Sequence, residues 1–398
     1  MACLIKAPSP SSKGVLTLTT QERDRLVYGF DDIRRLLVQV KQRYVIGLHH
    51  NWHDYSLNYD SLFDFHLAGD EDLREATGKR IPLLPMDACN FAPDFFRPGA
   101  AGEKFWDVLF VARAVEFKGI PEFFGAIRRL FDMGHRLRIL FICPVPEHGG
   151  TGSLRNVREL YDKVFIGKEQ DFFTLLTTNF RYPFPFDLPT LAHFYRASWV
   201  FAHSAPDERR CRVAAYAWAT GLPVVGMAPV GSVLTPALRR APYFFETTSY
   251  DDFPQQILSA LSVAKSQPDF TEVQAEIASH LSIRLFEQHL NRLLNDMNLP
   301  APKAGGWVQG LDIRMGRHHG LPAGINQLDQ DISSFLEFLC VAESAEMSKL
   351  AECEDPELEL ARRLPRVPRR IAAPRVPVAA RLKAALGAMR RRVVGAKR

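Results

Sequence analysis

Apolar runs alternate with segments of helical periodicity between Trp106 and Val225, and this alternation constrains the fold more than any other feature of the chain. Three of the runs, at residues 106–112, 137–143 and 199–204, are mostly apolar, which is typical of strands that are buried on both faces. Segments with apolar residues at helical spacing follow them. Strands that alternate with helices predict a parallel, doubly wound α/β sheet, whose ligands bind beyond the carboxyl ends of the strands.

Residues 213–238 carry no charged side chain and are long enough to cross a bilayer. Glycines and prolines nevertheless interrupt the stretch every few residues, at Gly221, Pro223, Gly226, Pro229, Gly231 and Pro236. These breaks predict a helix, a turn, a buried strand and a loop instead of a transmembrane helix.

A second, smaller α/β half is predicted upstream, from a helix at residues 31–40 and short strands at 44–49, 62–68 and 81–84. Downstream, residues 271–297 have the apolar pattern of a long helix that packs across both halves, and residues 327–351 predict a further helical extension. The chain is therefore expected to contain two α/β units and a C-terminal extension.

The charge of the chain is divided unevenly. Residues 362–398 hold thirteen of the 50 Lys and Arg and no Asp or Glu, which leaves a net charge of −8 on the first 361 residues. An acidic body and a tail without aromatic residues argue against nucleic acid as a partner. Six cysteines without regular spacing predict reduced thiols and a cytoplasmic location, and the N-terminus lacks the pattern of a secretory signal.

Within the tail, residues 379–394 have basic residues around an apolar stripe formed by Leu382, Leu386, Met389 and Val393. This pattern predicts an amphipathic basic helix that lies on an anionic membrane surface, which would make the protein peripheral on the cytoplasmic face. A disordered, solubilising tail is the alternative.

Two cations follow the first apolar run. Arg113 comes directly after it, Lys118 lies five residues further on, and Gly119 opens the next helix. A diphosphate at this strand end would meet the positive end of a helix, an ammonium and a planar guanidinium, which are the groups that neutralise phosphoryl oxygens. Two solvated surface cations are the alternative.

Polar residues also lie at the end of the run at 199–204 and after it. Ser204, Asp207 and Glu208 lie in the next turn, and Tyr216 follows Glu208 by eight residues, just over two helical turns. On one helix, Glu208 and Tyr216 would face the same cleft and bind sugar hydroxyls. Alternatively, the two acids complement the helix dipole and Tyr216 is a core aromatic.

Both stretches resemble motifs of the retaining GT-B glycosyltransferases of the group 1 family. VLFVARAVEFKGIPEFFGAIRRL is similar to that family's Gly-Arg-Leu-x-x-x-Lys-Gly segment, with Arg113 and Lys118 at the family's spacing. The block that begins at Ser204 resembles Ser-x-x-x-Glu followed by Glu-Ala-x-Ala-x-Gly-x-Pro-Val-Val, with Tyr216 in place of the second Glu. The resemblance implies that Arg113 and Lys118 bind the donor's diphosphate, that Glu208 contacts the donor sugar, and that Tyr216 approaches the ribose.

Upstream, YVIGLHH resembles the family's strand that ends in a His at the junction of donor and acceptor, which implies that His49 faces the cleft. The cluster His49, His50, Trp52 and His53 lacks the acidic partner and second ligand set of a known metal motif. No metal or other cofactor is expected besides the nucleotide-sugar substrate. Only 112 residues precede Arg113, fewer than in the family, so the resemblance implies a reduced acceptor-binding half.

The resemblance thus implies a GT-B-like fold of two Rossmann-like domains with doubly wound parallel sheets. The expected activity is transfer of a hexose, with retention, from a nucleotide-diphosphate donor to a saccharide or lipid-linked saccharide for cell-surface polysaccharide or glycoconjugate synthesis. A catalytically silent GT-B-like subunit that binds a glycan or a partner enzyme is the alternative. We expect an acceptor-side domain at 1–100, a nucleotide-sugar-binding domain with a closing helix at 101–298, a linker and helical extension at 299–360, and the basic tail at 361–398.

Overall fold

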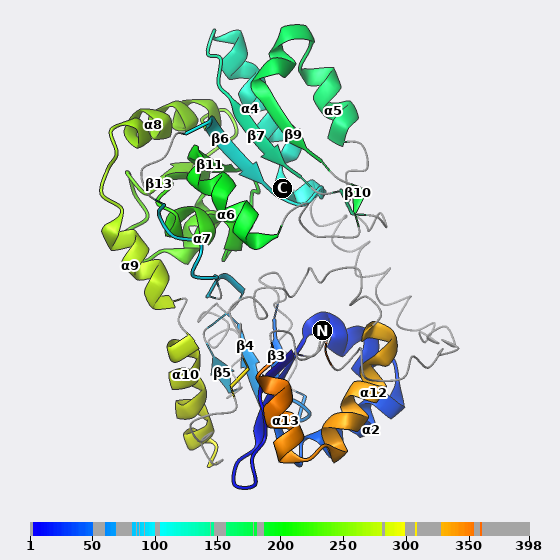
Figure 1. Ribbon diagram of the computed structural model, residues 1–398. Helices are drawn as coiled ribbons and strands as arrows, with labels where there is room; N and C mark the ends of the chain where they lie inside the picture. The colour runs from blue at the N-terminus through cyan, green and yellow to red at the C-terminus, as the bar shows by residue number, and fades with distance from the viewer. Residues whose placement is uncertain are drawn as a thin grey trace, which may run out of the picture.

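The computed structural model consists of two lobes, each built on a β-sheet (Figure 1). The upper lobe in that view contains the strands between residues 106 and 247, and the lower lobe contains those between residues 3 and 84. The structure describes residues 3–50, 60–68, 82–84, 86, 88–90, 92–99, 104–143, 145–146, 157–177, 179–180, 187–280, 283–298, 307–308, 328–353 and 359.

The sheet of the upper lobe has six parallel strands in the order β13-β12-β11-β6-β7-β9. From β6, at the centre of the sheet, the chain forms β7 and β9 toward one edge. It then forms β11, β12 and β13 toward the other edge. The order therefore reverses between β6 and β11, so the predicted doubly wound topology is confirmed for this lobe. The strands are β6 (Trp106–Val111), β7 (Ile139–Ile142), β9 (Phe173–Leu176), β11 (Ser198–His203), β12 (Val224–Met227) and β13 (Phe244–Thr247).

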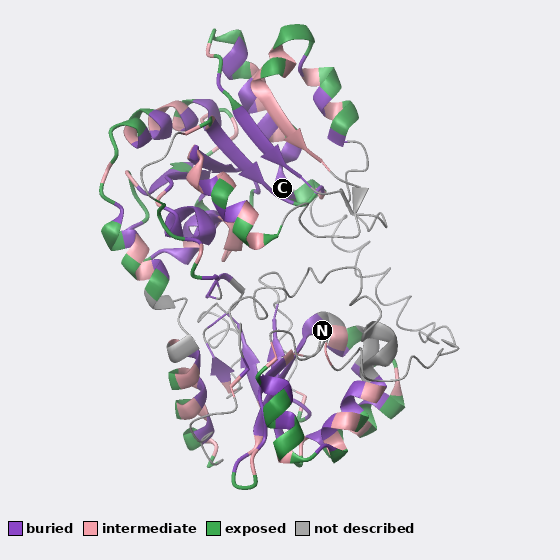
Figure 2. Ribbon diagram, in the orientation of Figure 1, coloured by how far each residue is buried: buried purple, intermediate pink, exposed green. Residues whose placement is uncertain are grey.

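Helices cover both faces of this sheet, so most of its strands are buried (purple in Figure 2), whereas the edge strand β9 is half-buried (pink). In β6, Val108 and Phe110 pack in the cluster that includes α4 (Ile120–Asp132), α5 (Val157–Val164) and α8 (Phe253–Lys265). Leu109 and Val111 point to the other face, where they pack with α6 (Leu188–Arg196), α7 (Arg212–Ala219) and α9 (Thr271–His280). Full burial of each such side chain contributes about 1.5–3 kcal/mol.

The uncharged stretch at residues 213–238 folds as expected, into most of α7, strand β12 and the 3-10 helix η5 (Ala228–Val233). No described helix is long and apolar enough to cross a membrane. Shorter elements complete the lobe: η3 (Glu116–Lys118), η4 (Gly167–Phe172) and a small parallel pair formed by β8 (Val145–Pro146) and β10 (Asn179–Phe180).

The sheet of the lower lobe runs in chain order from β1 to β5. Its first two strands form an antiparallel pair that the sequence patterns did not predict, and the remaining strands are parallel. Each parallel strand is added on the same side of the one before, so the order of the described strands in this sheet does not reverse. The strands are β1 (Cys3–Lys6), β2 (Gly14–Thr19), β3 (Tyr44–His49), β4 (Phe65–Leu67) and β5 (Leu83–Leu84).

The helices of the lower lobe come largely from the C-terminal part of the chain. One face of the sheet packs in a cluster with α2 (Asp31–Val40), α12 (Leu328–Val341) and α13 (Ser344–Ala351), and the other face packs against α10 (Ile283–Asp296). The segment described from sequence as an extension thus completes the N-terminal core. The long helix expected at 271–297 is two helices, with α9 on the upper lobe and α10 on the lower (Figure 1).

Three short elements, α1 (Thr20–Glu22), η1 (Arg23–Val27) and η2 (Ala88–Asn90), complete the described N-terminal part. The predicted fold class, α/β with two mainly parallel sheets, is confirmed.

Candidate functional site

The candidate site lies where the sheet order of the upper lobe reverses. Strand β6 continues into Arg113, η3 and Gly119, and strand β11 ends at His203 and continues into the loop 204–211. The two strands are hydrogen-bonded neighbours with Leu109 opposite Phe201, so their carboxyl ends and the loops that follow lie side by side. This is the position at which open α/β sheets bind ligands.

The two loops approach closely at Gly119, the N-cap residue of α4. Its φ of +64° lies in the left-handed region, and a Cβ at this position would meet the carbonyl oxygen of Ser204 at 2.3 Å. The Ser204 hydroxyl lies 2.9 Å from the carbonyl oxygen of Lys118 and 2.7 Å from that of Gly119. The Tyr250 hydroxyl in turn donates to the Ser204 carbonyl at 3.1 Å. These contacts hold the backbone of the first loop against the second.

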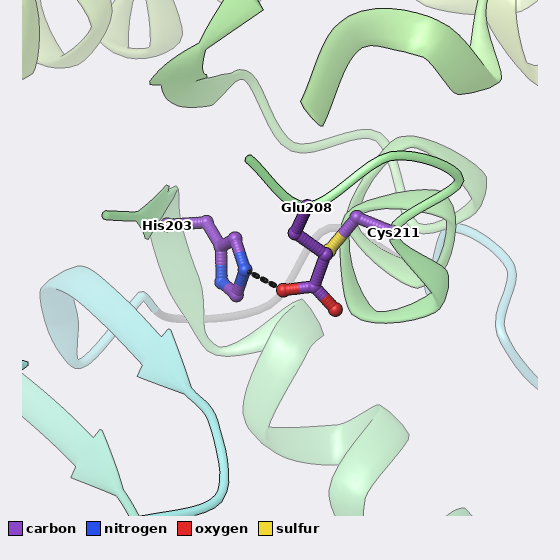
Figure 3. A group of neighbouring side chains, drawn as sticks. All are labelled: His203, Glu208 and Cys211. Atoms are coloured by element: carbon purple, nitrogen blue, oxygen red, sulfur yellow. Dashed lines mark hydrogen bonds and ion pairs between the residues drawn. The ribbon is translucent and has the colours of Figure 1, made fainter. Parts of the chain in front are cut away.

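The closeness of the loops brings Lys118 and Glu208 into a buried ion pair, in which Lys118 Nζ contacts Glu208 Oε2. His203 Nε2 lies 2.5 Å from the same oxygen (Figure 3). Burial by itself would raise the pKa of the Glu208 carboxyl, but the Lys118 ammonium and the His203 hydrogen bond outweigh burial and lower that pKa. Glu208 is therefore an ionised carboxylate in the free protein.

His203 was not singled out from the sequence. It is fully buried, and its ring lies near-parallel to those of Phe110 and Phe201. Burial lowers the pKa of the imidazole, and an ionised carboxylate only accepts hydrogen bonds, so neutral His203 donates from Nε2. The available signal was a polar residue in the next-to-last position of the buried strand predicted at residues 199–204.

The surroundings of the ion pair are cationic. Arg113 is exposed, and within the part of the chain that the structure describes its guanidinium makes no hydrogen bond or ion pair. Arg212, the first residue of α7, lies close enough for its guanidinium to repel that of Arg113. Arg113 and Lys118 follow strand β6, and Arg212 begins the helix that follows strand β11, so cations gather at these strand ends and attract anions. Arg212 is a further cation that the sequence motifs did not indicate.

One group of described residues has the geometry to hold a metal ion: the ligand atoms of His203, Glu208 and Cys211 lie within 4.8 Å of one another, and all three residues are buried. The Lys118 ammonium, however, already neutralises the Glu208 carboxylate. Burial also raises the pKa of the Cys211 thiol, which keeps it protonated. A metal ion would have to displace a bound ammonium, so the charges around this group favour an anion over a cation.

Tyr216 and Asp207 do not join the site. Helix α7 begins at Arg212, and Glu208 lies in the preceding loop, so the prediction that Glu208 and Tyr216 share one helix face is wrong. Tyr216 is 1% exposed and its ring stacks on Phe96, with ring centroids 3.9 Å apart. The Asp207 side chain is exposed to solvent. The helix starts late because Arg210 takes a φ of +52° and its N–H bonds to the Ser232 hydroxyl.

His49 is the last residue of β3 and is 4% exposed, at the carboxyl edge of the other sheet. No hydrogen bond between described residues joins it to Lys118, His203 or Glu208. Its neighbour His50 bonds to His66, with 2.8 Å between Nε2 and Nδ1, and burial lowers the pKa of His66 to about 3. The remaining residues of the histidine cluster, at positions 52 and 53, lie outside the described residues.

The sequence matches no protein-family model and no curated protein. Solved structures that are similar to this one include a glycosyltransferase from Rickettsia africae ESF-5 (11% identity, 68% of this chain and 82% of that chain, TM-score 0.49). Others are a sucrose-phosphate synthase from Thermosynechococcus elongatus (15%, 66% and 70%, TM-score 0.45) and Anabaena HepE in complex with UDP (13%, 66% and 77%, TM-score 0.46). At these levels of similarity no activity or residue role is transferred from them.

Proposed function

We propose that this protein is a glycosyltransferase that moves a sugar from a nucleotide-diphosphate donor to a saccharide or lipid-linked saccharide. The observation that carries the proposal is the Lys118–Glu208 ion pair at the switch point of a six-stranded parallel sheet, with Arg113 after the same strand as Lys118. Such a group can neutralise a diphosphate and bind sugar hydroxyls side by side. The motif resemblance found in the sequence supports the same assignment of these residues.

In the proposed reaction, Arg113 and Lys118 bind the diphosphate as negative charge develops on it during departure from the sugar. This is electrostatic stabilisation of the transition state, with no covalent step on the protein. The free backbone N–H groups at the start of α4, after Gly119, add partial positive charge. No metal is part of the proposal, because the cations of the chain supply the charge that the leaving group requires.

Glu208 would bind the hydroxyls of the donor sugar. In the free protein Glu208 and Lys118 are paired with each other, so the diphosphate must compete with the carboxylate for the ammonium. A ribose contact from Tyr216 is not part of the proposal, because its ring is stacked within the core. His49, at the carboxyl edge of the N-terminal sheet, is proposed to face the acceptor side.

The finer assignments rest on the motif resemblance. They are retention at the anomeric carbon, a hexose as the transferred sugar, and a role in cell-surface polysaccharide or glycoconjugate synthesis. The proposed cytoplasmic location rests instead on the scattered cysteines.

The proposal is tested by incubating the protein with UDP-glucose, UDP-N-acetylglucosamine and GDP-mannose and measuring the melting temperature and the nucleoside diphosphate released. A donor at one hundred times its Kd adds about 2.7 kcal/mol to the free energy of unfolding. Binding together with release supports the glycosyltransferase. A protein that binds glycans but no nucleotide would instead be the silent subunit.

Arg113→Ala is expected to lower nucleoside diphosphate release by about 10²-fold, because it removes a charge from the leaving group. Stability should change by less than about 0.5 kcal/mol, since the guanidinium is exposed and has no partner among the described residues. The control is Arg129→Ala, on α4, whose side chain is 52% exposed and pairs with Asp251. Equal turnover in the two variants would show that Arg113 does not bind the diphosphate.

The basic tail, residues 379–394, lies outside the described residues. We propose that it holds the protein on an anionic membrane, where lipid-linked acceptors are found, with about 1 kcal/mol from each basic residue near the surface. The full chain should sediment with anionic but not neutral vesicles, and added salt should release it. A chain that ends at Glu359 should stay in solution. Equal sedimentation of both chains would contradict a membrane role for the tail.

A further inference from the structure

His203 is the second partner of the Glu208 carboxylate, and the reaction proposed above gives it no role. Its ring centroid lies 6.3 Å from that of Phe110 and 6.0 Å from that of Phe201, both near-parallel, so packing fixes the direction in which Nε2 points. The other nitrogen, Nδ1, is buried and makes no hydrogen bond in the described part of the chain. The described polar contact of this imidazole is therefore with Glu208 alone.

The contact gains importance when a donor binds. Lys118 and His203 both contact Glu208 Oε2 in the free protein, and the proposed function requires Lys118 to turn toward the diphosphate. Glu208, whose side chain is 10% exposed in the free protein, then loses its ammonium partner. A buried carboxylate without a hydrogen-bond donor beside it is costly, and the Glu208 side chain would rotate away or take up a proton. Only a group that stays in place can keep the carboxylate in position.

We propose that His203 is a positioning residue, whose Nε2–H holds the Glu208 carboxylate ionised and directed at the donor sugar while Lys118 moves to the diphosphate. This inference rests on the proposed function. His203 is a fully buried residue at the end of strand β11, and its ring lies near-parallel to those of Phe110 and Phe201. The histidine therefore stays fixed as Lys118 moves.

Two substitutions distinguish the contribution of the Nε2–H group to turnover from that of the aromatic ring. His203→Phe keeps a flat ring beside Phe110 and Phe201 and removes the donor, and His203→Gln carries an amide N–H at about the reach of Nε2. We expect His203→Phe to lower kcat by about 10- to 100-fold, as for the loss of one hydrogen bond to a charged group. KM for the nucleotide sugar and Kd for UDP or GDP should change less than about threefold. His203→Gln should recover most of kcat.

A double-mutant cycle distinguishes positioning from a structural role. If His203 acts through Glu208, His203→Phe has no further effect on kcat once Glu208→Gln is present. If the histidine only supports the fold, the loss is the same in both backgrounds. That second result, or a parental kcat in His203→Phe, overturns the inference. If His203→Phe fails to fold, His203→Gln and His203→Asn test the inference instead. The shorter Asn amide does not reach Glu208, so only the Gln variant should restore kcat.

Failure of the proposed function gives a different result. A wild-type protein that neither binds UDP or GDP nor releases them from UDP-glucose, UDP-N-acetylglucosamine and GDP-mannose overturns the glycosyltransferase and, with it, the role of His203. Nucleotide binding and turnover that are insensitive to His203→Phe overturn the role of His203 alone.

Discussion

Replacing Lys118 with methionine is expected to lower turnover by about 10²- to 10³-fold, because the substitution removes a cation from the departing diphosphate. It should also lower the free energy of unfolding by about 3 kcal/mol. The reason is that Glu208 then remains as a buried carboxylate with His203 as its described partner, and breaking one side of a buried pair is strongly destabilising. Chemical unfolding and nucleoside diphosphate release measure the two effects separately.

The double variant Lys118→Met/Glu208→Gln should recover stability to within about 1 kcal/mol of the parent, because it removes both charges and leaves neither unpaired. Its turnover should stay as low as that of Lys118→Met. Lys265→Met is the matched control, since its side chain is 55% exposed and lies 3.8 Å from an Asp107 oxygen, and exposed pairs contribute little. Additive stability losses in the double variant would show that the pair is not coupled as the structure indicates.

Gly119→Ala is the second substitution with a large expected effect, about 3 kcal/mol in the free energy of unfolding. The new Cβ would combine a left-handed φ with a contact of 2.3 Å to the Ser204 carbonyl oxygen. Relief requires the loops after β6 and β11 to separate, which would move Lys118 away from Glu208. Because misplacement by about 1 Å costs about 10²-fold in rate, turnover should fall by at least that much.

Gly167→Ala is the control that separates the cost of the backbone conformation from the cost of the steric contact. Gly167 has a φ of +57°, close to that of Gly119, but a Cβ there meets no atom within 4 Å. We expect a cost of about 1 kcal/mol from the backbone conformation alone and parental turnover. Equal losses of stability in the two alanine variants would show that the close approach of the loops is not what requires glycine at position 119.

The sequence by itself determined the local elements of the upper lobe. Alternation of buried strands with amphipathic helices predicted β6, β7, β11 and β12, because strands covered on both faces must be continuously apolar. Helix ends were equally local: Asp187 accepts a hydrogen bond from the N–H of Thr190 as the N-cap of α6, and Gly119 opens α4. Since strand carboxyl ends carry the ligand-binding loops, these elements also located Arg113, Lys118 and Glu208 at one edge of the sheet.

The tertiary structure decided how these residues meet. Ninety positions separate Lys118 from Glu208, and their pairing depends on β6 and β11 being neighbours in the sheet, which follows from strand order and not from local pattern. Tyr216 illustrates the opposite case, because an eight-residue spacing suggested a shared face, whereas Phe96 from a distant segment buries the ring in the core.

The local sequence pattern also did not predict which helices complete the lower lobe. The amphipathic character of residues 283–296 and 328–351 was visible in the sequence, but an apolar face does not specify its partner, because hydrophobic burial is not directional. Only the folded chain shows that α10, α12 and α13 cover the sheet formed by the first 84 residues. Local periodicity thus determined the elements and the strand ends that carry the charges, whereas contacts between segments distant in the chain determined the ion pair, the buried histidine and the cover of the N-terminal sheet.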